Sequence, residues 1–234
     1  MLESQRGTIG VLLGKAELAI SNTTGIQEIK TAMAAAGYTD ARMAEARALL
    51  DNTRKAVTLV SSFKGGQKKS TETLKALWKD VNAAYQNISE TCKALFKGER
   101  STLTALGLDK RMPRATSEFI KSYYNLYDNA VSNPASAAKL AEYGYPAARL
   151  QSERAKITAF DKANKDQEAA KGSYQQAARE EKKLLKALKA WLNTFTRIAK
   201  VALKAKPDLL EKLGILARSK RPARKKKADK PAKA

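Results

Sequence analysis

Apolar residues recur along most of the chain at the three- and four-residue spacing of an amphipathic helix. The pattern is clearest after residue 183, where one stripe consists of Leu184, Leu188, Trp191, Phe195, Ile198 and Ala202. A similar stripe between residues 77 and 95 has Cys92 at its edge, which predicts a buried thiol. No segment alternates apolar and polar residues as a half-buried strand does. The pattern predicts an all-α protein.

The chain matches itself without gaps at an offset of 107 residues. Residues 8–114 and 115–221 share 23 identical positions. A repeat of this length indicates a duplicated domain, because solenoid repeats are about 20–50 residues long. We therefore expect a tandem duplication of an elongated, antiparallel helical bundle, with copy 1 at residues 1–114 and copy 2 at residues 115–216.

Paired glycines divide each copy. Because glycine is favoured just past the end of a helix, the pairs Gly37/Gly144, Gly65/Gly172 and Gly107/Gly214 predict helix ends. The expected helices in copy 1 are residues 8–21, 27–36, 40–64, 67–98 and 101–106. Those in copy 2 are residues 116–130, 134–143, 147–171, 174–205 and 207–213.

Residue types with catalytic or metal-binding chemistry are scarce. The chain has one cysteine and no histidine, so the usual thiol–imidazole and zinc arrangements have no partners. We expect no enzymatic activity, no cofactor and no metal site. The longest apolar run near the start, residues 8–14, is too short for a signal peptide or a membrane span. We expect a cytoplasmic protein without membrane insertion.

The chain is strongly basic. The net charge is +22, of which residues 217–234 carry +8 and the rest of the chain +14. This tail has no apolar residue larger than Ala or Pro, so it is expected to be disordered. Its candidate nucleic-acid-binding residues are Arg218, Lys220, Arg221, Arg224, Lys225, Lys226 and Lys227. A strongly basic surface attracts polyanions.

Two basic ridges lie opposite the apolar stripes in a helical projection. The ridge of copy 2 consists of Lys182, Lys186, Lys189, Arg197, Lys200 and Lys204. The ridge of copy 1 consists of Lys75, Lys79, Lys93 and Lys97. Long flexible lysine side chains along a helix are suited to phosphates. Lysine is also the commonest occupant of a solvated helix face, so this alternative stays open.

Two further segments have a structural and a functional interpretation. The Gly-Tyr corner at residues 33–43 superficially resembles the turn of a helix-turn-helix motif, with Arg42 and Arg149 at the start of the following helices. The apolar stripe of those helices favours a bundle corner instead. Phe119, Tyr123, Tyr124 and Tyr127 have helical spacing, which favours a core position over an interface.

The ending of the body resembles a known pattern. Trp191, Phe195, Ile198 and Ala199, followed by residues 207–215 (Pro-Asp-Leu-Leu-Glu-Lys-Leu-Gly-Ile), are similar to the ending of an uncharacterised family of duplicated helical-bundle proteins of bacteria. The resemblance implies a duplicated bundle and brings no activity or binding residue with it. The Lys/Ala/Pro-rich tail resembles the basic tails of linker histones, which neutralise phosphates without reading sequence.

These observations together favour a non-enzymatic protein that associates with DNA or another nucleic acid through its backbone, without sequence preference. Such a protein would be nucleoid-associated. The alternative is a helical scaffold or adaptor that binds a protein partner or itself, with a tail that only adds solubility.

Overall fold

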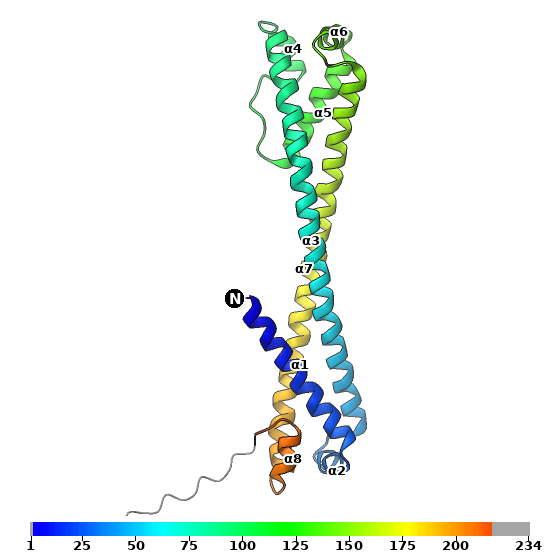
Figure 1. The fold of residues 1–234 in the computed structure, drawn as a ribbon, viewed down its shortest axis with the longest axis vertical. Helices are drawn as coiled ribbons and strands as arrows, with labels where there is room; N and C mark the ends of the chain where they lie inside the picture. The colour runs from blue at the N-terminus through cyan, green and yellow to red at the C-terminus, as the bar shows by residue number, and fades with distance from the viewer. Residues whose placement is uncertain (1, 217–234) are drawn as a thin grey trace, which may run out of the picture. The chain divides into compact units, whose positions relative to one another are not determined.

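The protein is all-α. A computed structural model describes residues 2–216, and the side chains of residues 7–216; the predicted tail, residues 217–234, lies outside this range. The described residues form eight α-helices and no strand, which confirms the fold class. In chain order (Figure 1) the helices are α1 (Leu2–Gly25), α2 (Gln27–Ala35), α3 (Asp40–Leu95), α4 (Arg100–Ala105), α5 (Thr116–Ser132), α6 (Pro134–Glu142), α7 (Ala147–Ala202) and α8 (Pro207–Lys212).

The helix bounds repeat at the spacing of the sequence match. Helices α2 and α6, α3 and α7, and α4 and α8 begin and end 107 residues apart, and α1 and α5 end 107 residues apart. Gly37 and Gly144 have φ of 90° and 84°, and Gly107 and Gly214 have φ of 73° and 70°. This left-handed conformation is accessible to glycine at little cost. The helix ends predicted at these two pairs are confirmed.

The helix ends predicted at Gly65 and Gly172 are wrong. Both glycines lie inside single helices of 56 residues, α3 and α7, and neither has a positive φ. A glycine inside a helix costs only about 0.5–1 kcal/mol relative to alanine. Starting a new helix costs more, because a new first turn must be nucleated. The four separate long helices predicted from the sequence are therefore two continuous ones.

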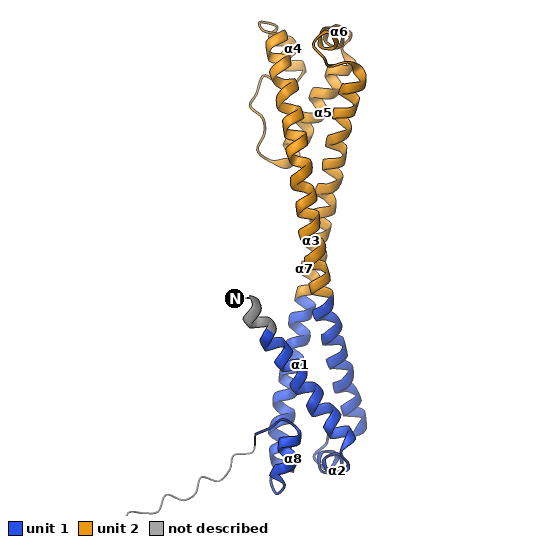
Figure 2. Cartoon of the chain, viewed as in Figure 1, with its two compact units in different colours: residues 1–58, 179–234 blue, residues 59–178 orange. Residues whose placement is uncertain are grey.

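The chain divides into two compact units whose boundaries differ from those of the predicted copies (Figure 2). Unit 1 comprises residues 1–58 and 179–234, and unit 2 comprises residues 59–178. Each unit thus contains half of each sequence copy, instead of residues 1–114 or 115–216. Because α3 does not turn back at Gly65, its second half cannot pack on the helices that precede it in copy 1.

The core of unit 1 joins the beginning of the chain to its end. Fully buried Ile20, Met33 and Leu50 lie in one cluster with Leu188 and Phe195 of α7 and with Leu209, Leu210 and Leu213 of α8 and its C-cap. The Phe195 ring meets Tyr38 edge-on at 5.1 Å and stacks with Trp191 at 5.2 Å. Trp191 itself is half-buried, because it lies at the margin of this core.

The core of unit 2 is aromatic. Phe119, Tyr123 and Tyr127 of α5 are completely buried, as the sequence predicts, whereas Tyr124 is half-buried. The Phe119 ring lies 4.7 Å from Trp78 of α3, and Tyr123 stacks on Tyr127 at 4.5 Å. Cys92 is buried in the same cluster, which confirms its predicted position.

Candidate nucleic-acid interface

All six residues of the second predicted ridge are exposed on unit 1. Lys182, Lys186, Lys189, Arg197 and Lys200 lie on α7, and Lys204 follows its last turn. None of the six forms an ion pair with another described residue. Residues 182–206 contain eight Lys or Arg and no Asp or Glu. Of these eight, Lys183 pairs with Glu180 and Lys206 pairs with Glu28. The six ridge residues are therefore the basic residues of this stretch that have no ion-pair partner among the described residues.

Three of these lysines lie closer to apolar surface than the helical projection predicts. Lys182, Lys186 and Lys189 line a groove of about 750 Å³ between α1 and α7, together with Lys15 of α1. They are therefore not diametrically opposite the core. Sequence reasoning missed Lys15, because its relation to α7 depends on how α1 packs.

The first predicted ridge lies on unit 2 and is weaker. Lys75, Lys79 and Lys93 on α3 and Lys97 just after it are all exposed and form no ion pair with the other described residues. Asp80 and Glu90 lie between them in sequence, so residues 75–97 carry a net charge of only +2. The two ridges belong to different compact units and are two separate candidate surfaces.

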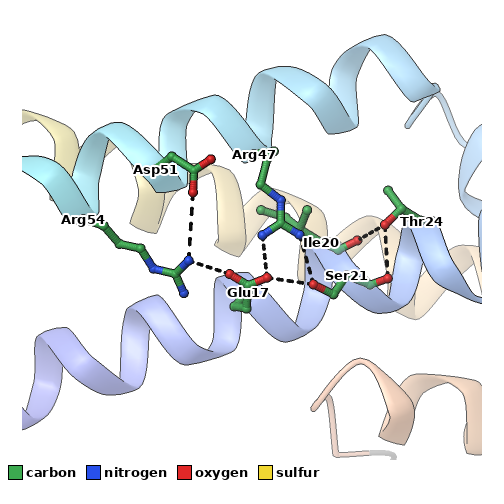
Figure 3. Close-up of polar contacts among 7 residues, drawn as sticks. All are labelled: Glu17, Ile20, Ser21, Thr24, Arg47, Asp51 and Arg54. Carbon is green, nitrogen blue, oxygen red and sulfur yellow. Dashed lines mark hydrogen bonds and ion pairs between the residues drawn. The ribbon is translucent and has the colours of Figure 1, made fainter.

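Two arginines of unit 1, Arg47 and Arg54, are occupied by a carboxylate. In Figure 3, Glu17 of α1 accepts from Arg47 Nη1 at 2.5 Å and pairs with Arg54 Nη1 at 2.7 Å, both on α3. The hydrogen bonds from Arg47 and from Ser21 Oγ (2.7 Å) hold the pKa of Glu17 down at about 2. These arginines tie α1 to α3 and do not present free charge to an anion.

The corner that resembles a helix-turn-helix has a structural role for its arginines. Arg42 Nη1 donates to the Gly37 carbonyl at 3.1 Å, and Arg149 Nη1 donates to the Gly144 carbonyl at 2.8 Å. Each guanidinium thus binds the carbonyl of the glycine that follows the C-cap of the preceding helix. This arrangement favours the bundle corner over base-specific recognition.

Unit 2 contains a buried cluster of polar side chains, which is the other candidate for a functional site. The Glu153 carboxylate accepts from Tyr127 Oη at 2.6 Å and from Arg149 Nε at 3.0 Å, and its carbonyl accepts from Tyr123 Oη at 2.9 Å. Burial raises the pKa of Tyr123 to about 12 and also raises the pKa of Tyr127, so both phenols stay protonated. The cluster links α5 to α7 and is closed to a substrate.

Reactive and metal-binding groups give no stronger candidate. Burial raises the pKa of the Cys92 thiol to about 12, which keeps it protonated and unreactive at neutral pH. Among the described residues, no group of three or more carboxylate, thiol or imidazole side chains is placed to hold a metal ion. In the same part of the chain, every helix is too short or too polar to cross a membrane.

The remaining candidates, from Arg218 to Lys227 in the tail, lie outside the described residues.

Comparisons with protein-family models, with curated proteins and with solved structures find no match to this chain. The chemistry of the described surface therefore has to support any functional assignment.

Proposed function

We propose that the protein is a non-enzymatic, sequence-independent nucleic-acid-binding protein, whose main contact surface is the α7 ridge of unit 1. One observation carries the proposal: between residues 182 and 206 there are eight basic and no acidic residues, and the six ridge side chains are exposed and unpaired among the described residues. Such a surface exchanges condensed counterions for phosphates, which is the main source of non-specific affinity.

The length of the ridge suits a duplex. At a rise of about 1.5 Å per residue, the step from Lys182 to Lys204 extends over roughly 33 Å, close to one turn of B-DNA at about 34–36 Å. Five of the six ridge residues are lysines, which contact phosphates as point charges, and only Arg197 offers a bidentate donor. This composition favours backbone contact over recognition of bases.

The proposal includes an internal duplication in which only one copy kept a strong basic ridge. It is supported by the 107-residue sequence match, by the equal spacing of the helix bounds and by the matching φ values at two glycine pairs. In this view, the α3 ridge with Lys75, Lys79, Lys93 and Lys97 is a secondary site. The tail, from Arg218 to Lys227, adds affinity by the same mechanism, and a nucleoid-associated, cytoplasmic location follows from it.

Charge reversal with a matched control tests the proposal. In a protein ending at residue 216, Lys182, Lys186, Lys189, Lys200 and Lys204 are changed to Glu, and duplex DNA binding is measured by fluorescence anisotropy against salt concentration. The control carries five changes to Glu at exposed, unpaired positions of unit 2: Lys64, Lys69, Lys110, Arg114 and Lys156. Both variants change the net charge equally.

The ridge variant is expected to lose measurable binding at about 50 mM salt, because the ridge then repels phosphate. The control is expected to keep most of the affinity and nearly the same slope of log affinity against log salt. Equal losses in the two variants would show that overall charge, and not this ridge, determines binding. In that case the alternative, a helical scaffold for a protein partner, becomes the better account.

A further inference from the structure

A groove in unit 1 has the lining of a docking site for a helix. It runs between α1 and α7, has a volume of about 750 Å³, and is lined by the apolar side chains of Ile9, Val11, Leu12, Leu185 and Leu192. Val11 is 57% exposed, and the other four are half-buried. A partly exposed apolar lining of this kind between two helices is typical of a site that a partner covers.

Lysines surround this apolar surface. Lys15, Lys182, Lys186 and Lys189 line the groove, are exposed and form no ion pair with another described residue; Glu181 is the acidic residue of the lining. A second hollow of about 250 Å³ shares Lys15 and Leu192 with the groove and adds Lys200. From Lys182 to Lys200, α7 extends over about 27 Å, the length of an 18-residue helix.

In unit 2, aromatic side chains of the chain itself fill the space that corresponds to this groove. At the 107-residue offset, Leu12, Leu185 and Leu192 correspond to Phe119, Trp78 and Tyr85. There the Phe119 ring lies 4.7 Å from Trp78 and 5.3 Å from Tyr85, and it is completely buried. Unit 1 has leucine at all three positions, so the ring volume that closes the space in unit 2 is missing.

We propose that the α1/α7 groove of unit 1 binds an acidic amphipathic α-helix of a protein partner. The apolar face of that helix covers the leucines, and its carboxylates meet lysines spaced i, i+4 and i+7 at Lys182, Lys186 and Lys189. A second copy of this chain is a poor occupant because its surface is basic, and nucleic acid has no aliphatic side chains to cover the groove. The inference rests on the groove and goes beyond the proposed function; because Lys182, Lys186 and Lys189 belong to both surfaces, the acidic helix and nucleic acid would compete for them.

Synthetic peptides test the proposal with the full chain. A fluorescein-labelled helix of about 18 residues, with Leu and Phe on one face and Glu on the rest, is titrated with the protein and followed by anisotropy. Two peptides serve as controls: a scrambled one with the same composition, and one with the same apolar face and Lys in place of Glu. The acidic amphipathic peptide is expected to bind at least about tenfold more tightly than either control, because only it matches both the leucines and the lysines.

Two protein variants locate the binding. Leu12→Phe with Leu185→Trp places the aromatic residues of unit 2 in the groove, and it is expected to weaken peptide binding about tenfold or more without lowering the thermal midpoint. Lys182→Glu with Lys186→Glu and Lys189→Glu is expected to reverse the preference, so that the Lys peptide binds better than the Glu peptide. This second variant decides the question if the first one does not fold.

Three results would overturn the proposal. Equal binding of the scrambled and the amphipathic acidic peptides would mean that charge alone attracts them. Unchanged binding by a folded Leu12→Phe/Leu185→Trp variant would place the peptide elsewhere. Groove-dependent binding to phosphatidylglycerol vesicles that is tighter than binding to the acidic peptide would identify a lipid surface as the occupant.

Discussion

At the residue scale, Glu17 shows how this basic protein uses its few carboxylates. It is half-buried on α1 and accepts from two arginines of α3, whose side chains are themselves more than a third exposed. Ion pairs of this exposure contribute about 0–1 kcal/mol each, because solvent screens them. The contribution of Glu17 is therefore small: it holds α1 on α3 and adds on the order of 1 kcal/mol to the free energy of unfolding.

Glu17→Gln is expected to lower the free energy of unfolding by about 1 kcal/mol at pH 7, measured by urea denaturation. The folded pKa, about 2, lies below the ordinary value of 4.5. The stability that Glu17 contributes is therefore complete above about pH 4.5 and is lost as the pH falls towards 2. The difference between wild type and variant should shrink over that range.

Glu45→Gln is the matched control, because Glu45 is exposed on α3 and pairs with no other described residue. It should leave the unfolding free energy unchanged at every pH. A Glu17→Gln effect that is constant from pH 7 to pH 2, or that grows on acidification, would contradict the assigned ion pairs.

At the element scale, glycines that pair at the same 107-residue offset have two different roles: some end a helix, and others lie inside one. Gly107 and Gly214 end helices with positive φ, whereas Gly65 and Gly172 lie within α3 and α7. An added Cβ would lie 2.7 Å from Asn125 Nδ2 at Gly107 and 2.9 Å from Leu18 Cδ2 at Gly214. At Gly65 and Gly172 it would meet no atom within 4 Å.

Alanine substitutions should separate the two classes. Gly65→Ala and Gly172→Ala are each expected to raise the unfolding free energy by about 0.5–1 kcal/mol, because alanine is the better helix former. Gly107→Ala and Gly214→Ala are each expected to lower it by about 1–2 kcal/mol, from the left-handed backbone alone. Destabilisation by Gly65→Ala in thermal or urea unfolding would indicate that the helix ends at that residue after all.

The helices and most of their faces were predictable from sequence, because both follow from local periodicity. The end at Gly37 has a start signal after it: Thr39 Oγ1 lies 3.5 Å from the backbone nitrogen of Arg42. Gly65 is followed by Gly66 and Gly172 by Ser173, and both glycine and serine are accepted N-caps, so capping residues gave no signal against a break at either position. A glycine alone does not distinguish a helix end from a helix interior.

At the scale of the whole molecule, the sequence did not predict that the first and last quarters of the chain would share one core. The apolar stripe around Phe195 shows that α7 is buried on one side, but not that it meets Ile20 and Met33 from the start of the chain. That choice depends on whether α3 turns back, which is a non-local consequence of one helix end. The exposure of the ridge lysines followed from the helical period, whereas the groove beside Lys15 depends on side-chain sizes in two distant segments.

Expression of half the chain tests this pairing. Residues 1–114 alone lack Leu188, Phe195 and Leu203, which complete the core around Ile20 and Met33. They also lack Phe119, Tyr123 and Tyr127, around which the other core is built. We expect this fragment to show no cooperative unfolding by circular dichroism and to gain it on mixing with residues 115–216. A cooperatively folded monomer of residues 1–114 would show that each sequence copy closes on itself.

The central claim is that nucleic acid lies along α7 in unit 1, and lysine footprinting tests it most directly. The full chain is treated with an amine-reactive reagent, with and without duplex DNA, and the modification of each lysine is measured by mass spectrometry. The account predicts strong protection of Lys182, Lys186, Lys189, Lys200 and Lys204. It predicts little protection of Lys64, Lys69 and Lys156, which are also exposed but lie on unit 2. Uniform protection of both sets, or protection confined to unit 2, would contradict it.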